Sequence, residues 1–454
     1  MAQAKQDMGS GSVKKLMLQL MIPAVVAQVV NLLYNIVDRI YIGHIAGIGA
    51  AALTGVGLFT PILMLLNAFA MLVGAGGAPR TAIALGQGDK EQAEKIISNS
   101  FTMLLLFSVV LTVVFYAGAP TLLRLFGASD ATLPYALAYS RIYILGSMFV
   151  LLVLGMNPFI TTQGFAKTSM LTTLIGAVCN IILDPIFIFA CDMGVRGAAL
   201  ATVISQAISC VWVLVFLHSE KSGLRLSAGT IRFRRELLSC MALGVAPFIM
   251  QASESVISVC FNSSLLKYGD DIAVGAMTIL SSVMQFAMLP LQGIAQGAQP
   301  ITSYNYGARN TQRVRKTFRL LLKVCLCYSV ALWAVIQLCP GAFARIFTPN
   351  VALVAFTVPA LRIYCGALFL FGIQIACQMT FVSIGAAGCS IIVAVLRKFV
   401  LLLPLIYLMP RLLADQTMAV YTAEPVADAI AVTCTAILFA VQFRKALRKL
   451  DAED

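Results

Sequence analysis

Long apolar runs, separated by short loops rich in Gly, Pro, Lys and Arg, constrain this chain more than any other feature. Residues 101–116 and 204–217 are two examples. About twenty apolar residues are needed to cross the hydrocarbon core of a membrane as a helix. Only helices and closed barrels satisfy their backbone polar groups there, and these runs lack the strict alternation of barrel strands. Charged residues make up 11% of the chain, against about 25% in a soluble domain, so the sequence predicts an all-α membrane protein.

Hydropathy predicts twelve transmembrane helices, and the first is expected to be a retained span because no cleavage pattern follows it. The predicted spans are 16–40, 50–73, 96–118, 136–156, 168–190, 198–217, 238–262, 275–298, 318–340, 357–381, 390–409 and 424–443.

The basic residues concentrate in alternate loops, around 80–95, 218–236, 309–319 and 444–449. Because cytoplasmic loops carry an excess of Lys and Arg, this pattern predicts a multi-pass protein of the inner (plasma) membrane with both termini in the cytoplasm. The net charge of +13 is then explained by topology, and we expect no binding of nucleic acid.

The second half of the sequence repeats landmarks of the first. Arg141-Ile142-Tyr143 recurs 221 positions later as Arg362-Ile363-Tyr364, and Gly164 recurs at the same separation as Gly385. An even number of spans in each half makes the two halves parallel repeats, related by an axis along the membrane normal. Transporters with such repeats place the substrate path between them.

The repeat predicts two parallel six-helix lobes, 1–217 and 237–454, joined by a cytoplasmic inter-lobe loop at 218–236. Two moving lobes favour alternating access over a channel, which would not need repeated halves. An enzyme would need a catalytic cluster facing water, which the sequence does not offer, so we expect no enzymatic activity.

Carboxyl groups inside predicted spans are functional candidates, because an unpaired charge there is costly. Asn180 and Asp184 in the fifth span are four residues apart and therefore share a helix face, and Thr202 and Asn157 could add oxygens. Asp38 is a second first-half acid. The group suits Na⁺ or a proton, although structural hydrogen bonds between spans are an alternative interpretation.

Glu254 in the seventh span is the third acid inside the predicted membrane region, and Arg397 in the eleventh span is its expected partner. Glu254 could attract a cationic substrate, carry a proton or form a structural pair with Arg397, and these alternatives stay open. We expect Lys398 to extend its ammonium toward the membrane interface.

The cysteines and histidines show no spacing typical of metal ligands. We therefore expect neither a cofactor nor a metal, apart from Na⁺ at Asp38, Asn180 and Asp184, with Na⁺ or H⁺ as the coupling ion.

Several motifs together resemble the multidrug and toxic compound extrusion (MATE) family, of the bacterial type, over nearly the whole chain. The matching segments are Tyr34-Asn35-Ile36-Val37-Asp38, Gly86-Gln87-Gly88-Asp89, Asn180 to Asp184 with Pro185, and Gln296-Gly297-Ala298-Gln299-Pro300 followed by Tyr304-Asn305-Tyr306-Gly307-Ala308.

The resemblance implies an antiporter that exports organic cations or amphipathic drugs against Na⁺ or H⁺. It also implies a cation-coupling site at Asp38, Asn157, Asn180, Asp184 and Thr202, with Glu254 as a second-lobe acid.

One departure from the family concerns the tenth span, where some branches carry an aspartate and this sequence has Gln374 and Gln378. The departure favours the first lobe as the coupling site. The alternative function is a lipid-linked precursor flippase of a related superfamily, which would have a basic central cavity. We expect a monomer whose partners are small organic cations or drugs and the lipid bilayer.

Overall fold

The computed structural model describes residues 8–226, 235–269, 271–347 and 349–452, and within these ranges every regular element is a helix. Ten helices are long and apolar enough to cross a membrane, or up to twelve if two bent pairs count as one span each. The predicted all-α, twelve-span architecture is therefore confirmed.

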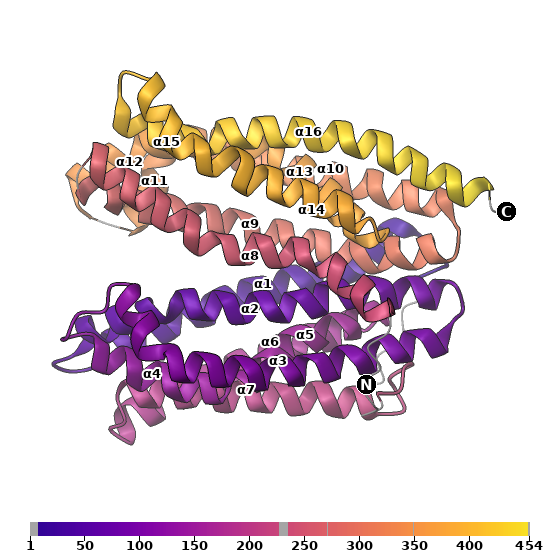
Figure 1. Cartoon of the computed structure of the whole chain (residues 1–454), viewed down its shortest axis with the longest axis horizontal. Coiled ribbons are helices and arrows are strands. Elements are labelled where there is room, and N and C mark those ends of the chain that lie inside the picture. The colour runs from indigo at the N-terminus through magenta and orange to yellow at the C-terminus, as the bar shows by residue number, and fades with distance from the viewer. Residues whose placement is uncertain (1–7, 227–234, 270, 348, 453–454) are drawn as a thin grey trace. The chain divides into compact units, whose positions relative to one another are not determined.

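The first half of the chain contains seven α-helices and one π-helix (Figure 1). They are α1 (Val13–Gly43), α2 (Gly49–Gly86), α3 (Lys90–Leu125), α4 (Leu133–Leu145), α5 (Ser147–Thr162), α6 (Ala166–Pro185), η1 (Ile186–Ala190) and α7 (Val195–His218).

The second half contains nine α-helices, a 3₁₀ turn and a second π-helix within the described residues. They are α8 (Arg235–Tyr268), α9 (Asp271–Gly307), α10 (Thr311–Leu338), α11 (Pro340–Phe347), α12 (Val351–Tyr364), η2 (Leu368–Leu370), α13 (Phe371–Ser383), α14 (Ala387–Val395), η3 (Leu396–Leu402), α15 (Leu403–Leu412) and α16 (Gln416–Ala452).

Two predicted spans are broken where hydropathy gives no sign of a break. The span at 136–156 becomes α4 and α5, bent by 55°, and the span at 357–381 becomes α12 and a segment from Leu368 onward, bent by 40°. The first break is at Gly146, where a Cβ atom would lie 2.4 Å from the side chain of Val203. Glycine allows this close approach and also weakens the helix locally.

The repeat extends to the local backbone of both halves. Asp89 caps α3 by accepting a hydrogen bond from a backbone N–H three residues on, and Asn310, 221 positions later, caps α10 in the same way. The residue before each cap has a positive φ, +78° at Gly88 and +56° at Arg309. Matching turns and caps therefore begin equivalent helices.

Two compact units divide the described residues. Val26–Gln251 belong to the first, and Gly9–Val25 with the chain from Ala252 onward belong to the second. Consequently α1 begins in the second unit and α8 begins in the first. The lobe boundaries at 217 and 237 stay a prediction, because units defined by contacts need not coincide with lobes that move. Part of the predicted inter-lobe loop, 227–234, lies outside the described residues, as do 1–7 and 453–454.

Glycines allow the first parts of α1 and α8 to pack closely against their own units. A Cβ atom at Gly76 of α2 would lie 2.0 Å from the carbonyl oxygen of Cys240 in α8. The equivalent glycine of α9, Gly297, would place a Cβ atom 2.5 Å from the Cα atom of Met21 in α1. Neither contact leaves room for a side chain, so both helices depend on these glycines.

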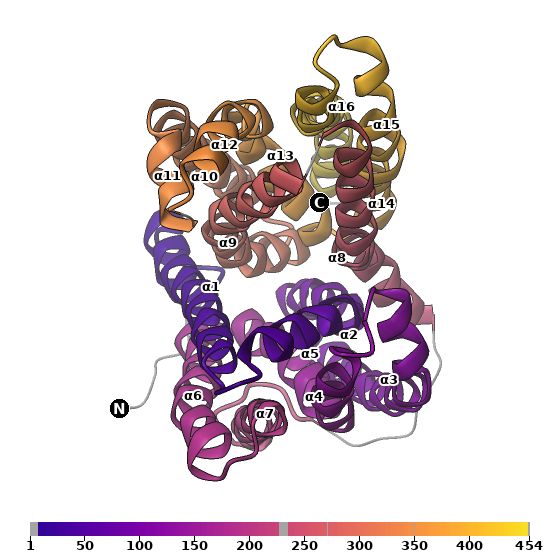
Figure 2. The same cartoon turned by 90° about the vertical axis from the view of Figure 1, so that its left-hand side faces the viewer.

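Inner helices occupy equivalent places in the two units. In the first unit α5 contacts α2, α3, α6 and α7, and in the second unit α13 contacts α9, α10, α14 and α16. Figure 2 looks nearly along the helices and shows α2 and α5 close together. Most side chains of α5 and α13 are buried, so each of these helices lies in the packed interior of its own unit.

Candidate functional site

A buried polar group joins α6 to α7 in the first unit. Asn180 Nδ2 donates to Asp184 Oδ1 and to Thr202 Oγ1, both at 3.3 Å. Asp184 is fully buried, and Asn180 and Thr202 are nearly so. The four-residue spacing places Asn180 and Asp184 on one face of α6, and Thr202 completes the group from α7.

Asp38 of α1 brings a second carboxyl group to Asp184. The two carboxyl groups lie close enough for each to act on the other, and the exposed fraction of Asp38 is only 8%. Two desolvated carboxylates this close repel strongly unless a cation or a shared proton lies between them. The site can therefore hold one positive charge.

Three oxygens in this group have no donor among the described residues. Asp38 Oδ1, Asn180 Oδ1 and Asp184 Oδ2 are buried and accept no hydrogen bond from a protein N–H or hydroxyl group. Buried polar atoms nearly always have a partner, so unsatisfied ones indicate a bound ion, water or proton. Carboxylate and amide oxygens are ligands for hard cations.

Tyrosines lie around the carboxyl pair, and no role was assigned to them in the sequence analysis, which considered the acids. Tyr34 lies one turn before Asp38, close enough for the charges of both carboxyls to act on its hydroxyl. Tyr139 and Tyr143 of α4 lie near Asp38, and Tyr139 also lies near Thr202. Two signals were available in the sequence, because Tyr34 opens the motif that ends at Asp38 and Tyr143 belongs to the repeated Arg-Ile-Tyr landmark.

The place of Asn157 in the cation-coupling site stays a prediction. Its Nδ2 donates to the carbonyl oxygen of Ser169 at 3.2 Å, and Ser169 precedes Asn180 by eleven residues, about 16 Å along a helix. Gln378 Nε2 makes the equivalent bond to the carbonyl oxygen of Ser390, also at 3.2 Å and 221 positions later. A bond present in both halves indicates that Asn157 holds two helices together.

The expected pairing of Glu254 with Arg397 is wrong. Lys398 Nζ donates to Glu254 Oε1 at 2.5 Å. Arg397 instead donates to Asp428 Oδ1 at 2.8 Å and to Glu424 Oε1 at 3.2 Å. Lys398 does not extend to the interface, because its side chain is only 5% exposed.

Glu424 and Asp428 are buried acids that the sequence reasoning missed. The predicted twelfth span, 424–443, placed Glu424 at its edge and already contained Asp428, which the search for acids overlooked. Because α16 begins two turns earlier at Gln416, Glu424 also lies well within the helix, and both acids are buried. Their spacing of four residues, which places them on one face, was a signal available in the sequence.

Comparison with known proteins gives the family. The MatE family model matches twice, over residues 23–186 and 247–408. The multidrug export protein MepA of Staphylococcus saprophyticus is 24% identical over 399 residues, covering 88% of this chain and 87% of that protein. MepA of Staphylococcus haemolyticus is 25% identical over 364 residues, covering 80% and 79%.

Solved structures agree with the family assignment. A MATE protein in complex with MaD3S is 25% identical, with a TM-score of 0.89 over 97% of this chain and 98% of that one. A MATE protein in the straight conformation gives the same identity, TM-score and coverage. The double match of the family model corresponds to the two halves of the sequence repeat. The chain belongs to the MatE family of multidrug and toxic compound extrusion transporters, and it is a transporter rather than an enzyme.

Proposed function

We propose that this transporter exports organic cations or amphipathic drugs in exchange for Na⁺ or H⁺, and that Asp38, Asn180, Asp184 and Thr202 form the coupling site. The observation that carries the proposal is the set of three buried oxygens without a donor, on two acids and an amide that share one site. Asn157 stays a predicted further member of the site, because its Nδ2 bonds to Ser169 while its Oδ1 is buried without a donor among the described residues.

Pairing of the basic residues in the second unit favours cationic cargo over the flippase alternative. A carrier of lipid-linked phosphates needs basic side chains that can bind phosphate. Arg397 and Lys398 are both buried and bonded to carboxylates, so neither presents its charge to an anion. The names of the MepA relatives, which describe multidrug export, support the same choice of cargo.

We further propose that a single copy of the chain works by alternating access, with both termini in the cytoplasm and the spans in the plasma membrane. The distribution of basic loop residues supports this orientation. In the proposed cycle the coupling ion on the first-lobe carboxyls stabilises one arrangement of the helices, and its release allows the other.

The proposal is tested by efflux of a fluorescent monovalent dye, ethidium, from proteoliposomes with an imposed Na⁺ gradient or an imposed proton gradient. We expect one gradient to drive transport and Asp184→Asn to abolish the dependence on it, because an amide cannot exchange a proton or balance a cation. The matched control is Asp130→Asn, which removes an exposed acid that pairs with Arg124 in the loop between α3 and α4. Transport that depends on neither gradient, or that survives Asp184→Asn unchanged, contradicts the proposal.

A further inference from the structure

The ion pair between Lys398 and Glu254 in the second unit is unequally buried. The Lys398 side chain is 5% exposed, whereas that of Glu254 is 47% exposed. A lysine whose only role is to neutralise an accessible carboxylate would gain by leaving its own charge in water. Here a nearly buried ammonium is paired with an acid whose side chain is about half exposed.

The π-helix η3 presents adjacent basic residues to different neighbours. Arg397 bonds to α16, and Lys398 bonds to α8. Such wide turns within α-helical spans occur frequently at functional sites. Arg397 is further fixed by the ring of Phe371, whose centroid lies 4.7 Å from its guanidinium carbon. Arg397 is thus held by two carboxylates and an aromatic ring, whereas Lys398 is bonded to Glu254.

The charges around this turn do not cancel. Glu254, Glu424 and Asp428 supply three negative charges, and Arg397 and Lys398 supply two positive ones, so the ionised group carries one excess negative charge. The excess lies on the buried side, where two carboxylates share one guanidinium. The Lys398 ammonium is near enough to Glu424 to act on its carboxylate.

We propose that Lys398 is a tethered counter-cation of Glu254, which a monovalent organic cation displaces when it binds to this acid. The displaced ammonium then moves toward Glu424, where the excess negative charge accepts it. This inference rests on the proposed function, because it assumes organic cations as cargo, and it assigns a residue that determines which cargo can bind.

Charge balance explains the class of ligand. With one monovalent cation on Glu254 the group becomes neutral, whereas a divalent cation would leave it positive and an anion would double its negative charge. Because a buried net charge is costly, the neutral combination is favoured. The Lys398 ammonium thus has two positions, one at Glu254 and one toward Glu424. The ligand shifts the population toward the second position, because it binds only when Glu254 is vacated.

Equilibrium binding of tetraphenylphosphonium, a lipophilic monovalent cation, to the purified full-length protein tests the inference. We expect Lys398→Met to tighten binding by about tenfold or more, because the ligand no longer competes with a tethered ammonium. Glu254→Gln should weaken binding by a similar factor, and Lys398→Met combined with Glu254→Gln should bind no more tightly than the unaltered protein. Asp130→Asn is the matched control and should bind normally.

Glu424→Gln tests the destination of the ammonium and serves if Lys398→Met does not fold. Glu424 is buried and is not the acid to which the ligand binds. We nevertheless expect removal of its negative charge to weaken binding by at least about fivefold, a typical coupling between sites. If folded Lys398→Met binds as the unaltered protein does, or more weakly, the tethered-cation inference is refuted while the proposed function stands. If Lys398→Met does not fold and Glu424→Gln binds normally, the inference is likewise refuted. Absence of tetraphenylphosphonium binding to the unaltered protein refutes the organic-cation cargo and the inference together.

Discussion

Replacement of Arg397 by methionine should be among the most destabilising single changes in the second unit. The Arg397 side chain is 8% exposed and bonds to two carboxylates that are 3% and 6% exposed. Methionine fills a similar volume but removes the guanidinium to which both Glu424 and Asp428 bond. Removing one partner of a buried ion pair costs about 3–5 kcal/mol, and here two carboxylates are left instead of one.

Thermal unfolding of the purified protein in detergent measures this effect. At about 2 °C per kcal/mol, the lower end for large chains, the midpoint should fall by about 6–10 °C. Arg397→Met combined with Glu424→Gln and Asp428→Asn should recover most of the loss, because neutral residues of similar volume can replace a buried ion group at little cost.

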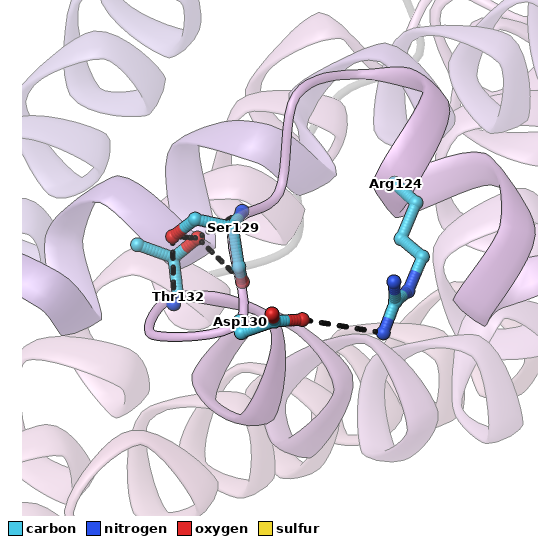
Figure 3. A network of polar contacts seen from close by, with 4 residues as sticks. All are labelled: Arg124, Ser129, Asp130 and Thr132. Atoms are coloured by element: carbon cyan, nitrogen blue, oxygen red, sulfur yellow. Dashed lines mark hydrogen bonds and ion pairs between the residues drawn. The ribbon is translucent and has the colours of Figure 1, made fainter.

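The control is an exposed ion pair in the first unit. Arg124 Nη2 and Asp130 Oδ1 lie 3.4 Å apart in the loop after α3, beside the hydrogen-bonded Ser129 and Thr132 (Figure 3). Both charged side chains are more than half exposed, so Arg124→Met should cost about 0–1 kcal/mol. Equal midpoints for Arg397→Met and Arg124→Met, or a triple variant less stable than Arg397→Met, would show that this reasoning is wrong.

Glycine replacements give three further predictions, all measured as unfolding midpoints. Gly76→Val should prevent close packing of α2 with α8, because a Cβ atom would lie 2.0 Å from the Cys240 carbonyl oxygen. Gly88 and Gly57 both have open space around an added Cβ atom, so they differ mainly in backbone conformation. Gly88→Ala should cost about 1 kcal/mol, because its φ of +78° is strained for alanine. Gly57→Ala, within α2, should stabilise by about 0.5–1 kcal/mol. Midpoints of Gly88→Ala and Gly57→Ala that move in the same direction would contradict both assignments.

The fold could be predicted because the membrane reduces the choice of structure to apolar helices, and hydropathy and repeat offsets locate them. The helix breaks at Gly146 and after Tyr364 could not be predicted from the sequence. Many glycines and small residues lie within the predicted spans, and only tertiary contacts such as that of Gly146 with Val203 distinguish a bend from a packed helix.

The candidate site was predictable where local geometry decides it. The spacing of Asn180 and Asp184 places them on one helix face whatever the rest of the chain does. Which acid each of Arg397 and Lys398 bonds to was not predictable. Adjacent residues of a regular helix point about 100° apart, and the π-helix η3 changes which neighbouring helix each side chain contacts. The burial of Glu424 depended on where a long helix begins, which hydropathy locates poorly.

The repeat conserves the bonds that hold helices together and does not conserve the charges. The Asn157–Ser169 bond has its counterpart in Gln378–Ser390. By contrast, the positions 221 residues after Asn180 and Asp184 are Leu401 and Leu405.

The charged residues of the second half likewise have no charged counterparts in the first, because Gly176 and Ala177 stand 221 residues before Arg397 and Lys398. Each half therefore has the same scaffold but its own polar group. Neutralising Asp184 in one half leaves no equivalent acid in the other to replace it. If the two lobes exchange roles during transport, they do so through shared helix geometry, because each buried group of charged side chains is present in one half alone.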